Sequence, residues 1–371
     1  MASRNKLFEP INVGSLSLRH RVVLAPLTRS RATAKHVHNT ALAAEYYRQR
    51  SSVPGTLLIS EATVVAGKAG GLQHVPNVET QEQVEAWKGV CEAVHEKDCF
   101  IFMQLWAHGR SADPRLLAKE GGWDVVSASD VPLTGRRKPR PLTTSEVKEY
   151  IEFYANAASR AVHEVGFDGV EIHAANGYLI DQFLQDKTNH RNDEYGGSIE
   201  NRARFALEIL QAITEKVGQE KVGIRLSPWE YYNEMRMDDP IPTFTYLVKR
   251  IAELYPNLAW IHVVEPRISG NFDREVPEGE SNDFIREIWA PRPIISAGGY
   301  TRDIALEVAE TKGDLIAFGR YFISNPDLPR RLKENLPLNP YNRATFYHPP
   351  ESPVGYIDYP FADAVDAQAR L

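Results

Sequence analysis

Short apolar runs alternate with longer amphipathic stretches along nearly the whole chain. The apolar runs are mostly continuous, which is typical of strands buried on both faces of a parallel sheet. The stretches between them carry apolar residues at helical spacing. The pattern predicts eight strands, each followed by a helix. The predicted strands are residues 21–28, 56–63, 100–106, 170–173, 222–227, 259–264, 293–297 and 314–318. The predicted helices are residues 41–50, 81–97, 144–165, 199–217, 243–255, 283–289, 302–311 and 327–335.

Eight strand–helix units close naturally into a barrel. A short hairpin through Val13-Gly14-Ser15 precedes them, and residues 107–143 and 342–371 are too long to be plain connectors. We expect both long segments to cover the mouth or the base. The predicted fold is therefore α/β, a (β/α)8 TIM barrel with a short N-terminal hairpin and a long capping insertion after the third strand, in which residues 1–371 form one domain. The alternative is an open doubly wound sheet with an extra lobe, but the chain has no Gly-x-Gly-x-x-Gly dinucleotide motif.

The composition and net charge of the chain indicate which kinds of partner it can bind. The chain has 371 residues, and its 43% apolar and 25% charged content fits a soluble globular protein. The net charge is 43 − 49 = −6, with no long basic block, which argues against nucleic-acid and anionic-membrane binding. The chain gives no preference between a monomer and a homodimer.

Cysteine usage and the chain ends bear on metals and location. Cys91 and Cys99 are too few for a disulfide framework or an iron–sulfur cluster, and no zinc spacing is present, so we predict no metal. The N-terminus lacks an apolar signal region, and no apolar run reaches about 20 residues. We therefore expect a cytoplasmic protein. The alternative is peroxisomal import through Ala369-Arg370-Leu371, a small-basic-Leu ending.

Glycines and an arginine follow the last two predicted strands. Gly298-Gly299 and Gly319-Arg320 each lead from a strand towards a helix. Glycine lets the backbone approach a ligand closely, and helix starts favour anions. The loops after strands seven and eight are the usual phosphate site of a (β/α)8 barrel, so these turns predict one.

Two further polar residues, Gln104 and Arg225, lie near the C-terminal ends of predicted strands, where active sites of this architecture are found. A carboxamide edge can pair with a ring amide, and an inward arginine can stabilise developing negative charge. The alternative for Arg225 is a buried ion pair, with Glu61 as a candidate partner.

The fourth strand ends in three polar residues, His173, Asn176 and Tyr178. The first two can both donate to one oxygen, and the phenol can act as a proton donor. A single histidine at a strand end is as often structural as catalytic. A hydrolytic metal site is disfavoured, because no set of two histidines and a carboxylate occurs at the strand ends.

These motifs together resemble the old yellow enzymes, flavin-dependent ene-reductases that include the plant oxophytodienoate reductases. The likeness spans nearly the whole chain. The matching stretches are residues 25–29, 58–63, 104–106, 173–179, 189–198, 200–202, 225–228 and 355–360, together with the two glycine turns. The family's proline-bearing turn is absent around residues 36–39, some relatives have a second histidine in place of Asn176, and another branch has cysteine in place of Thr28.

The resemblance implies tightly bound, non-covalent FMN across the barrel mouth. Its phosphate would sit on the two glycine turns. Gln104 would pair with the pyrimidine edge, Arg225 would stabilise negative charge at N1, and Thr28 would tune the redox potential. The implied cofactor-binding residues are Pro26, Thr28, Ala62, Gln104, Arg225, Gly298, Gly299, Gly319 and Arg320.

The resemblance also implies the reaction, an NADPH-dependent reduction of the C=C bond of α,β-unsaturated carbonyl or nitro compounds. His173 and Asn176 would hold the activating oxygen, hydride would pass from flavin N5 to the β-carbon, and Tyr178 would protonate the α-carbon. Phenolic ligands would inhibit. The implied pocket walls are Trp106, Tyr347, Tyr232 and Phe272.

Three other functions are alternatives to this reaction. A larger dienoyl-CoA-reductase type would need cluster cysteines and a second nucleotide domain, which the chain lacks. A flavin-binding protein without turnover would have lost one of the three polar residues that follow the fourth strand. A phosphate-substrate isomerase on the same barrel would be colourless.

Overall fold

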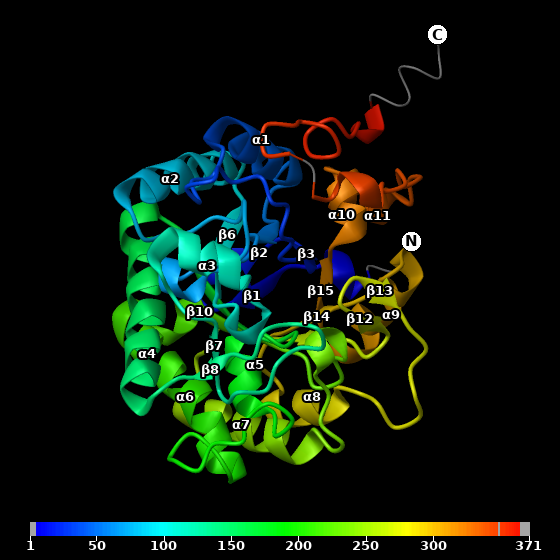
Figure 1. Ribbon diagram of the computed structural model, residues 1–371. Helices are drawn as coiled ribbons and strands as arrows, with labels where there is room; N and C mark the ends of the chain where they lie inside the picture. The colour runs from blue at the N-terminus through cyan, green and yellow to red at the C-terminus, as the bar shows by residue number, and fades with distance from the viewer. Residues whose placement is uncertain (1–4, 348, 364–371) are drawn as a thin grey trace.

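The computed structural model describes residues 5–347 and 349–363, so the Ala369-Arg370-Leu371 ending lies outside the described residues. Within the described part of the chain, eight parallel strands close into a barrel surrounded by helices (Figure 1). The strands are β3 (Val22–Leu24), β4 (Leu57–Ile59), β6 (Phe100–Trp106), β9 (Gly169–Ala174), β10 (Val222–Leu226), β11 (Trp260–Val264), β14 (Ile294–Ala297) and β15 (Leu315–Phe318). Their order is β4-β3-β15-β14-β11-β10-β9-β6, and β6 pairs back to β4. The predicted (β/α)8 barrel is confirmed.

Helices follow the strands as the apolar spacing predicted. They are α1 (Thr40–Arg50), α2 (Gln81–His95), α4 (Thr144–Ser159), α6 (Ile199–Val217), α7 (Ile241–Leu254), α8 (Asp283–Trp289), α9 (Arg302–Lys312), α10 (Arg320–Ser324) and α11 (Leu328–Glu334). Thr143 caps α4, because its side chain accepts the N–H of Glu146 in a capping box. The predicted helix 144–165 changes to a π-helical turn at Arg160–Val165.

One predicted strand is interrupted. Residues 56–63 form β4, then leave the barrel ladder, and pair again only at β5 (Thr63–Val64). In the break, the Glu61 N–H donates to the Tyr47 hydroxyl instead of to a strand (2.9 Å). Residues 21–28 likewise form a strand only at β3. The residues that follow β3 and β4 therefore leave the barrel wall and can turn towards its mouth.

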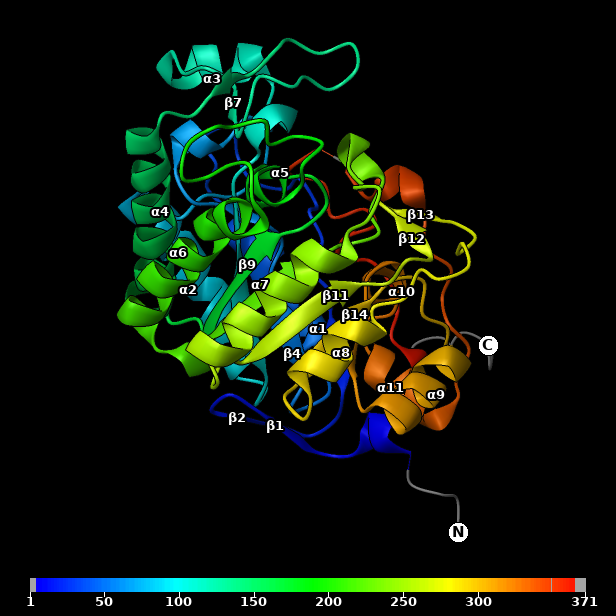
Figure 2. The ribbon, with the colours of Figure 1, turned by 90° about the horizontal axis from the view of Figure 1, so that it is seen from below.

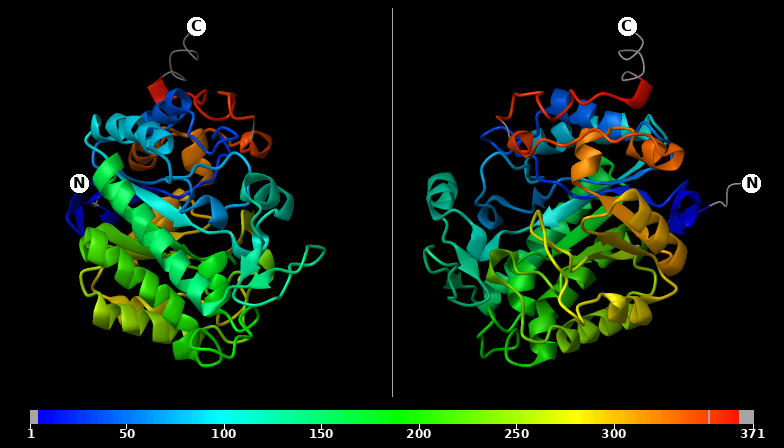
Figure 3. Two further views of the ribbon diagram at one scale, coloured as in Figure 1. Left: turned by 60° about the vertical axis from the view of Figure 1, so that its left-hand side comes forward. Right: turned by 90° about the vertical axis from the view of Figure 1, so that its right-hand side faces the viewer.

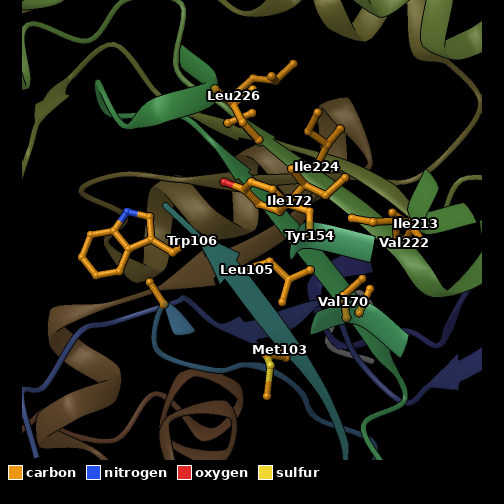
Figure 4. Packing of buried hydrophobic residues seen from close by; sticks show 14 of the residues in the cluster. Met103, Leu105, Trp106, Tyr154, Val170, Ile172, Ile213, Val222, Ile224 and Leu226 are labelled. Atoms are coloured by element: carbon orange, nitrogen blue, oxygen red, sulfur yellow. The ribbon is translucent and has the colours of Figure 1, made fainter. Parts of the chain in front are cut away.

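The barrel strands divide their side chains between two layers. On β9, Val170 and Ile172 belong to the same buried hydrophobic cluster as Tyr154 of α4 and Ile213 of α6, and so face outward (Figure 4). The residues that alternate with them, such as Glu171, therefore point into the barrel. A strand that is apolar on its outer face thus carries polar groups inside.

The base of the barrel is closed by large side chains and by the N-terminal hairpin. The hairpin, β1 (Ile11–Val13) and β2 (Leu16–Leu18), packs its Val13 into the same cluster as Phe102 and Trp260. A Cβ at Gly223 would lie 2.3 Å from the Trp260 indole nitrogen, so glycine makes room for this ring. The hairpin lies at the opposite end of the barrel from β12 (Ile268–Ser269) and β13 (Phe272–Asp273) (Figure 2). A ligand site is therefore expected at the C-terminal ends of the strands.

The two long segments lie where they can shape that end. Residues 107–143 contain α3 (Pro114–Gly121), β7 (Val126–Ser127) and β8 (Arg140–Pro141), and they project beside the barrel (Figure 3). They are joined to α5 (Leu179–Leu184) by the Ser127 hydroxyl, which donates to Gln182 (2.8 Å). The C-terminal segment is tied down by Arg29, which donates to the Gly355 carbonyl (2.7 Å). Among the helices of the described residues, none is long and apolar enough to cross a membrane.

Candidate active site

Two adjoining cavities, of about 400 Å³ and about 610 Å³, open at the C-terminal ends of the barrel strands. They share part of their lining, including Pro26, Asn176 and Arg225. Every site residue named from the sequence lines at least one of them. These residues are Pro26, Thr28, Ala62, Gln104, Trp106, His173, Asn176, Tyr178, Arg225, Tyr232, Phe272, Gly298, Gly299, Gly319, Arg320 and Tyr347.

The smaller cavity contains a cradle suited to an oxyanion. Gly298 and Gly299 have φ angles of +130° and +58°, and a Cβ at Gly299 would lie 3.3 Å from Asp273 Oδ1. Arg320 donates to both oxygens of the same carboxylate, at 2.6 and 3.0 Å. This arginine holds the pKa of Asp273 below its ordinary value. The cradle thus already binds an oxyanion, the Asp273 carboxylate. Its two contacts with Arg320 have the bidentate geometry that suits carboxylates and phosphates.

The wall of the smaller cavity is made of small residues. Ala25, Ala297 and Ala317 come from the first, seventh and eighth barrel strands or their ends and line the cavity. On the opposite side of the barrel, the inward residues are larger and polar. The space left over the alanines can accept a flat, ring-shaped ligand.

Gln104 and Arg225 point into the barrel mouth from β6 and β10. Gln104 Nε2 donates to Glu171 (2.9 Å), which leaves its second N–H and its oxygen for a ligand. Arg225 Nε is buried without a hydrogen-bond partner among the described residues. The predicted alternative, an ion pair with Glu61, is not formed, because Glu61 lies 3.0 Å from His38 Nε2. An arginine whose buried Nε has no partner is a site for a ligand with negative charge.

His173 presents a defined donor to the larger cavity. Its Nδ1 accepts the N–H of Ala175 (3.4 Å), so the neutral ring carries its proton on Nε2. Burial, reinforced by the charge of Arg225, holds the pKa of His173 well below its ordinary value. The residue is therefore a neutral hydrogen-bond donor near pH 7.

Asn176 is fixed by its backbone rather than by its side chain. It adopts a left-handed conformation (φ +56°), its N–H donates to the Ser227 hydroxyl (2.7 Å), and its carbonyl accepts from Asn233 (2.9 Å). Its side-chain oxygen has no hydrogen-bond partner among the described residues. The amide is therefore available to the cavity it lines.

Tyr178 stands between two aromatic rings, at the start of α5. Its ring meets Trp106 edge-on at 4.7 Å and His173 at 4.9 Å. Burial raises the pKa of Tyr178 well above its ordinary value, and Tyr232 and Tyr347 add to the effect. The phenol therefore keeps its proton at neutral pH, which a proton donor requires.

An aromatic rim surrounds the larger cavity. Tyr232, Phe272 and Tyr347 line it and are 45%, 65% and 60% exposed. Phe346 and Leu72, which were not named from the sequence, complete this edge. The rim is apolar enough to hold an organic substrate over the polar floor.

Several polar residues of the site were missed from the sequence. Glu171 is fully buried and accepts hydrogen bonds from three side chains, including His262 Nδ1 (2.8 Å). His108 is buried against Trp106, and burial lowers its pKa to about 3. Asp273 occupies the oxyanion cradle. Glu171 could have been found from the alternation of side chains along a strand. It lies two residues before His173, so both side chains point inward.

The residues present fit FMN. A phosphate matches the glycine turns and Arg320, a flat ring matches the alanine-lined space, and the unpaired Arg225 Nε suits an electron-rich edge of such a ring. The Gln104 amide matches a pyrimidine edge. Among the described residues, no group of three or more histidine, cysteine or acidic side chains is placed to hold a metal ion.

Comparison with known proteins agrees with this geometry. Residues 6–339 match the NADH:flavin oxidoreductase / NADH oxidase family. The chain is 47% identical to a chanoclavine-I aldehyde reductase from Penicillium roqueforti (strain FM164), over 96% of each chain. Among solved structures it resembles an Old Yellow Enzyme from Pichia sp. AKU4542 (TM-score 0.87, 37% identity, covering 96% of this chain and 94% of that one). It also resembles morphinone reductase in complex with tetrahydroNAD (TM-score 0.87, 40% identity, covering 96% and 98%). The chain therefore belongs to the NADH:flavin oxidoreductase / NADH oxidase family and is a flavin-dependent oxidoreductase of the old yellow enzyme type.

Proposed function

We propose that this enzyme reduces the C=C bond of small α,β-unsaturated carbonyl or nitro compounds, with non-covalently bound FMN and with NADPH as the hydride source. The observation that carries the proposal is the convergence of three groups on one cavity: the His173 Nε2–H, the Asn176 amide and the Tyr178 hydroxyl. Two hydrogen-bond donors and one proton donor are what polarisation and protonation of an activated alkene need.

We assign the cofactor contacts as follows. Gly298, Gly299, Gly319 and Arg320 would hold the FMN phosphate, and Gln104 would hold the pyrimidine edge. Pro26, Thr28 and Ala62 would border the ring where the smaller cavity adjoins the larger one. FMN, when bound, would supply the two-electron redox chemistry that links oxidation of the nicotinamide to reduction of the alkene.

The chain's own residues supply the remaining chemistry. His173 and Asn176 donate hydrogen bonds to the carbonyl or nitro oxygen, which draws electron density away from the β-carbon. Tyr178 donates its phenolic proton to the α-carbon. Because the pKa of Tyr178 is raised by burial, its proton is retained until charge develops on the substrate. Arg225 stabilises negative charge at the edge of the ring. Trp106 and the aromatic rim wall the substrate off from water.

A product analysis tests the reaction type. We expect an enal such as cinnamaldehyde, incubated with the enzyme, FMN and NADPH, to give the saturated aldehyde. Formation of the allylic alcohol instead would mean that the C=O bond is reduced, and the assignment of Tyr178 to the α-carbon would fail. NADH compared with NADPH in the same assay, by kcat/KM, tests the proposed donor, and a preference for NADH would refute it.

Phenols test the oxygen-binding pair independently of turnover. A phenolate resembles the enolate-like oxygen that His173 and Asn176 are proposed to hold. We expect phenolic ligands to bind to the oxidised enzyme and to inhibit it in competition with the alkene. A phenol that inhibits without competing would contradict this placement.

A further inference from the structure

A layer of buried polar side chains lies inside the barrel, just below the two cavities. Its centre is Glu171 of β9, which is fully buried. The carboxylate accepts hydrogen bonds from Gln104 Nε2 (2.9 Å), Trp260 Nε1 (2.8 Å) and His262 Nδ1 (2.8 Å). These partners come from β6 and β11, and the proposed reaction uses only one of them, Gln104.

The carboxylate is the acceptor in all three contacts. Burial alone would raise the pKa of Glu171, but His262, Arg225 and Trp260 hold it below its ordinary value. Burial lowers the pKa of His262, and a carboxylate only accepts, so the neutral ring carries its proton on Nδ1. The layer therefore contains a fixed negative charge.

The charge that offsets it belongs to Arg225 on the neighbouring strand β10. Arg225 pairs in register with His173 of β9, two residues after Glu171. Its Nε has no hydrogen-bond partner among the described residues. Glu171 and Arg225 thus balance each other without a direct contact, and the arginine stays available to the cavity.

We propose that Glu171 is a positioning residue for the flavin site: its carboxylate orients the amide of Gln104 and offsets the positive charge that Arg225 presents to the cofactor. This inference rests on the proposed function. Because Glu171 takes one N–H of Gln104, the other N–H and the oxygen face the ligand in a fixed order. A ligand that is hydrogen-bonded to Gln104 lies about two hydrogen-bond lengths (~6 Å) from the Glu171 carboxylate. At that distance the negative charge of Glu171 disfavours negative charge on the ligand. Glu171 therefore lowers the reduction potential of bound FMN.

The test is the midpoint potential of FMN in the holoenzyme, measured by equilibration with a reference dye. Glu171→Gln keeps the size of the side chain and removes its charge. A unit charge within about 10 Å, at an effective dielectric constant near 20, changes such an equilibrium by about tenfold or more. We expect the equilibrium constant for two-electron reduction to rise about tenfold, a positive shift of about 30 mV.

Trp260→Phe is the matched control. It removes one hydrogen bond to the same carboxylate but leaves the charge, and the indole lies in the barrel interior below the cavities. In this variant we expect the equilibrium constant for two-electron reduction to change by less than about twofold. A shift as large as that of Glu171→Gln would show that disruption of the layer, and not its charge, sets the potential, and would overturn the inference.

A second variant covers a failure of Glu171→Gln to fold. The double variant Glu171→Met, His262→Leu removes the carboxylate together with a donor that would be left unpaired, a change that buried polar pairs often tolerate. The same rise in potential is expected. An unchanged potential in either folded variant overturns the inference and leaves the proposed function standing. A wild-type protein that binds no FMN overturns the proposed function itself.

Discussion

Replacement of Tyr178 by phenylalanine separates the two halves of the proposed reaction. The ring packs edge-on against Trp106 and His173 at 4.7 and 4.9 Å, and phenylalanine keeps both contacts. Only the hydroxyl is lost, and the residue is half-buried at the cavity wall. The variant should therefore fold normally and bind FMN.

The expected loss is that of one general acid. Such a group contributes about 10²–10⁴ in rate, or about 3–5 kcal/mol of transition-state stabilisation. We expect oxidation of the reduced enzyme by an enone to slow by that factor in Tyr178→Phe. Reduction by NADPH transfers no proton through Tyr178, so its rate should change by less than about threefold.

The assay is anaerobic stopped-flow absorbance, with each half-reaction started separately. The control is Tyr255→Phe, which removes a hydroxyl from a tyrosine that lines neither cavity. We expect both of its half-reactions to stay within about threefold of the wild type. Equal slowing of both half-reactions in Tyr178→Phe would refute the proton-donor role. So would a Tyr255→Phe variant that loses as much alkene reduction.

Three further predictions concern binding and stability. His173→Ala should weaken phenol binding about tenfold, because one hydrogen bond to a charged oxygen is lost, and unchanged titrations would contradict the clamp. In fluorescence titrations, Asp273→Asn should bind FMN more tightly than the wild type, because the Asp273 carboxylate competes with the phosphate for Arg320. Arg320→Ala should bind FMN more weakly. Equal affinities in the three proteins would contradict the assignment of the phosphate to this cradle. Burial lowers the pKa of His20 to about 4 and of His108 to about 3, so the unfolded chain alone takes up these protons below pH 6.5. The free energy of unfolding, by urea denaturation, should therefore fall by up to about 3 kcal/mol per pH unit between pH 6 and 4, and constant stability would refute their burial as neutral rings.

The barrel could be predicted because its signal is local. Continuous apolar runs and helical spacing repeat eight times, and each repeat folds into the strand–helix unit it predicted. The interruption after β4 could not be predicted, because it depends on Tyr47 of α1 accepting the Glu61 N–H. A hydrogen bond between distant segments leaves no periodic trace.

The site divides in the same way. His173, Asn176 and Tyr178 lie at the end of one strand, and the glycine turns follow two others, so their positions alone predicted that they would meet. The partners of Arg225 and Arg320 could not be predicted. Glu61 was a reasonable candidate for Arg225, yet it lies beside His38, while Arg320 binds Asp273 of β13, 47 residues earlier. Which carboxylate reaches which arginine depends on loops that sequence spacing does not place.

The sequence also left the barrel interior underdetermined. Glu171 and His262 each stand within an apolar strand, where a single polar residue predicts no particular partner. Only the closed barrel brings them within 2.8 Å of each other. The polar layer beneath the cavities is therefore a product of tertiary structure.

The central claim, that the cavities hold FMN between a nicotinamide and an alkene, is tested most directly by one absorption measurement. The pure protein, supplemented with FMN and freed of excess, is followed anaerobically while NADPH and then an enone are added in turn. We predict a flavin band that bleaches with NADPH and returns with the enone. A protein with no flavin band, or a band that NADPH bleaches and the enone does not restore, would contradict the account.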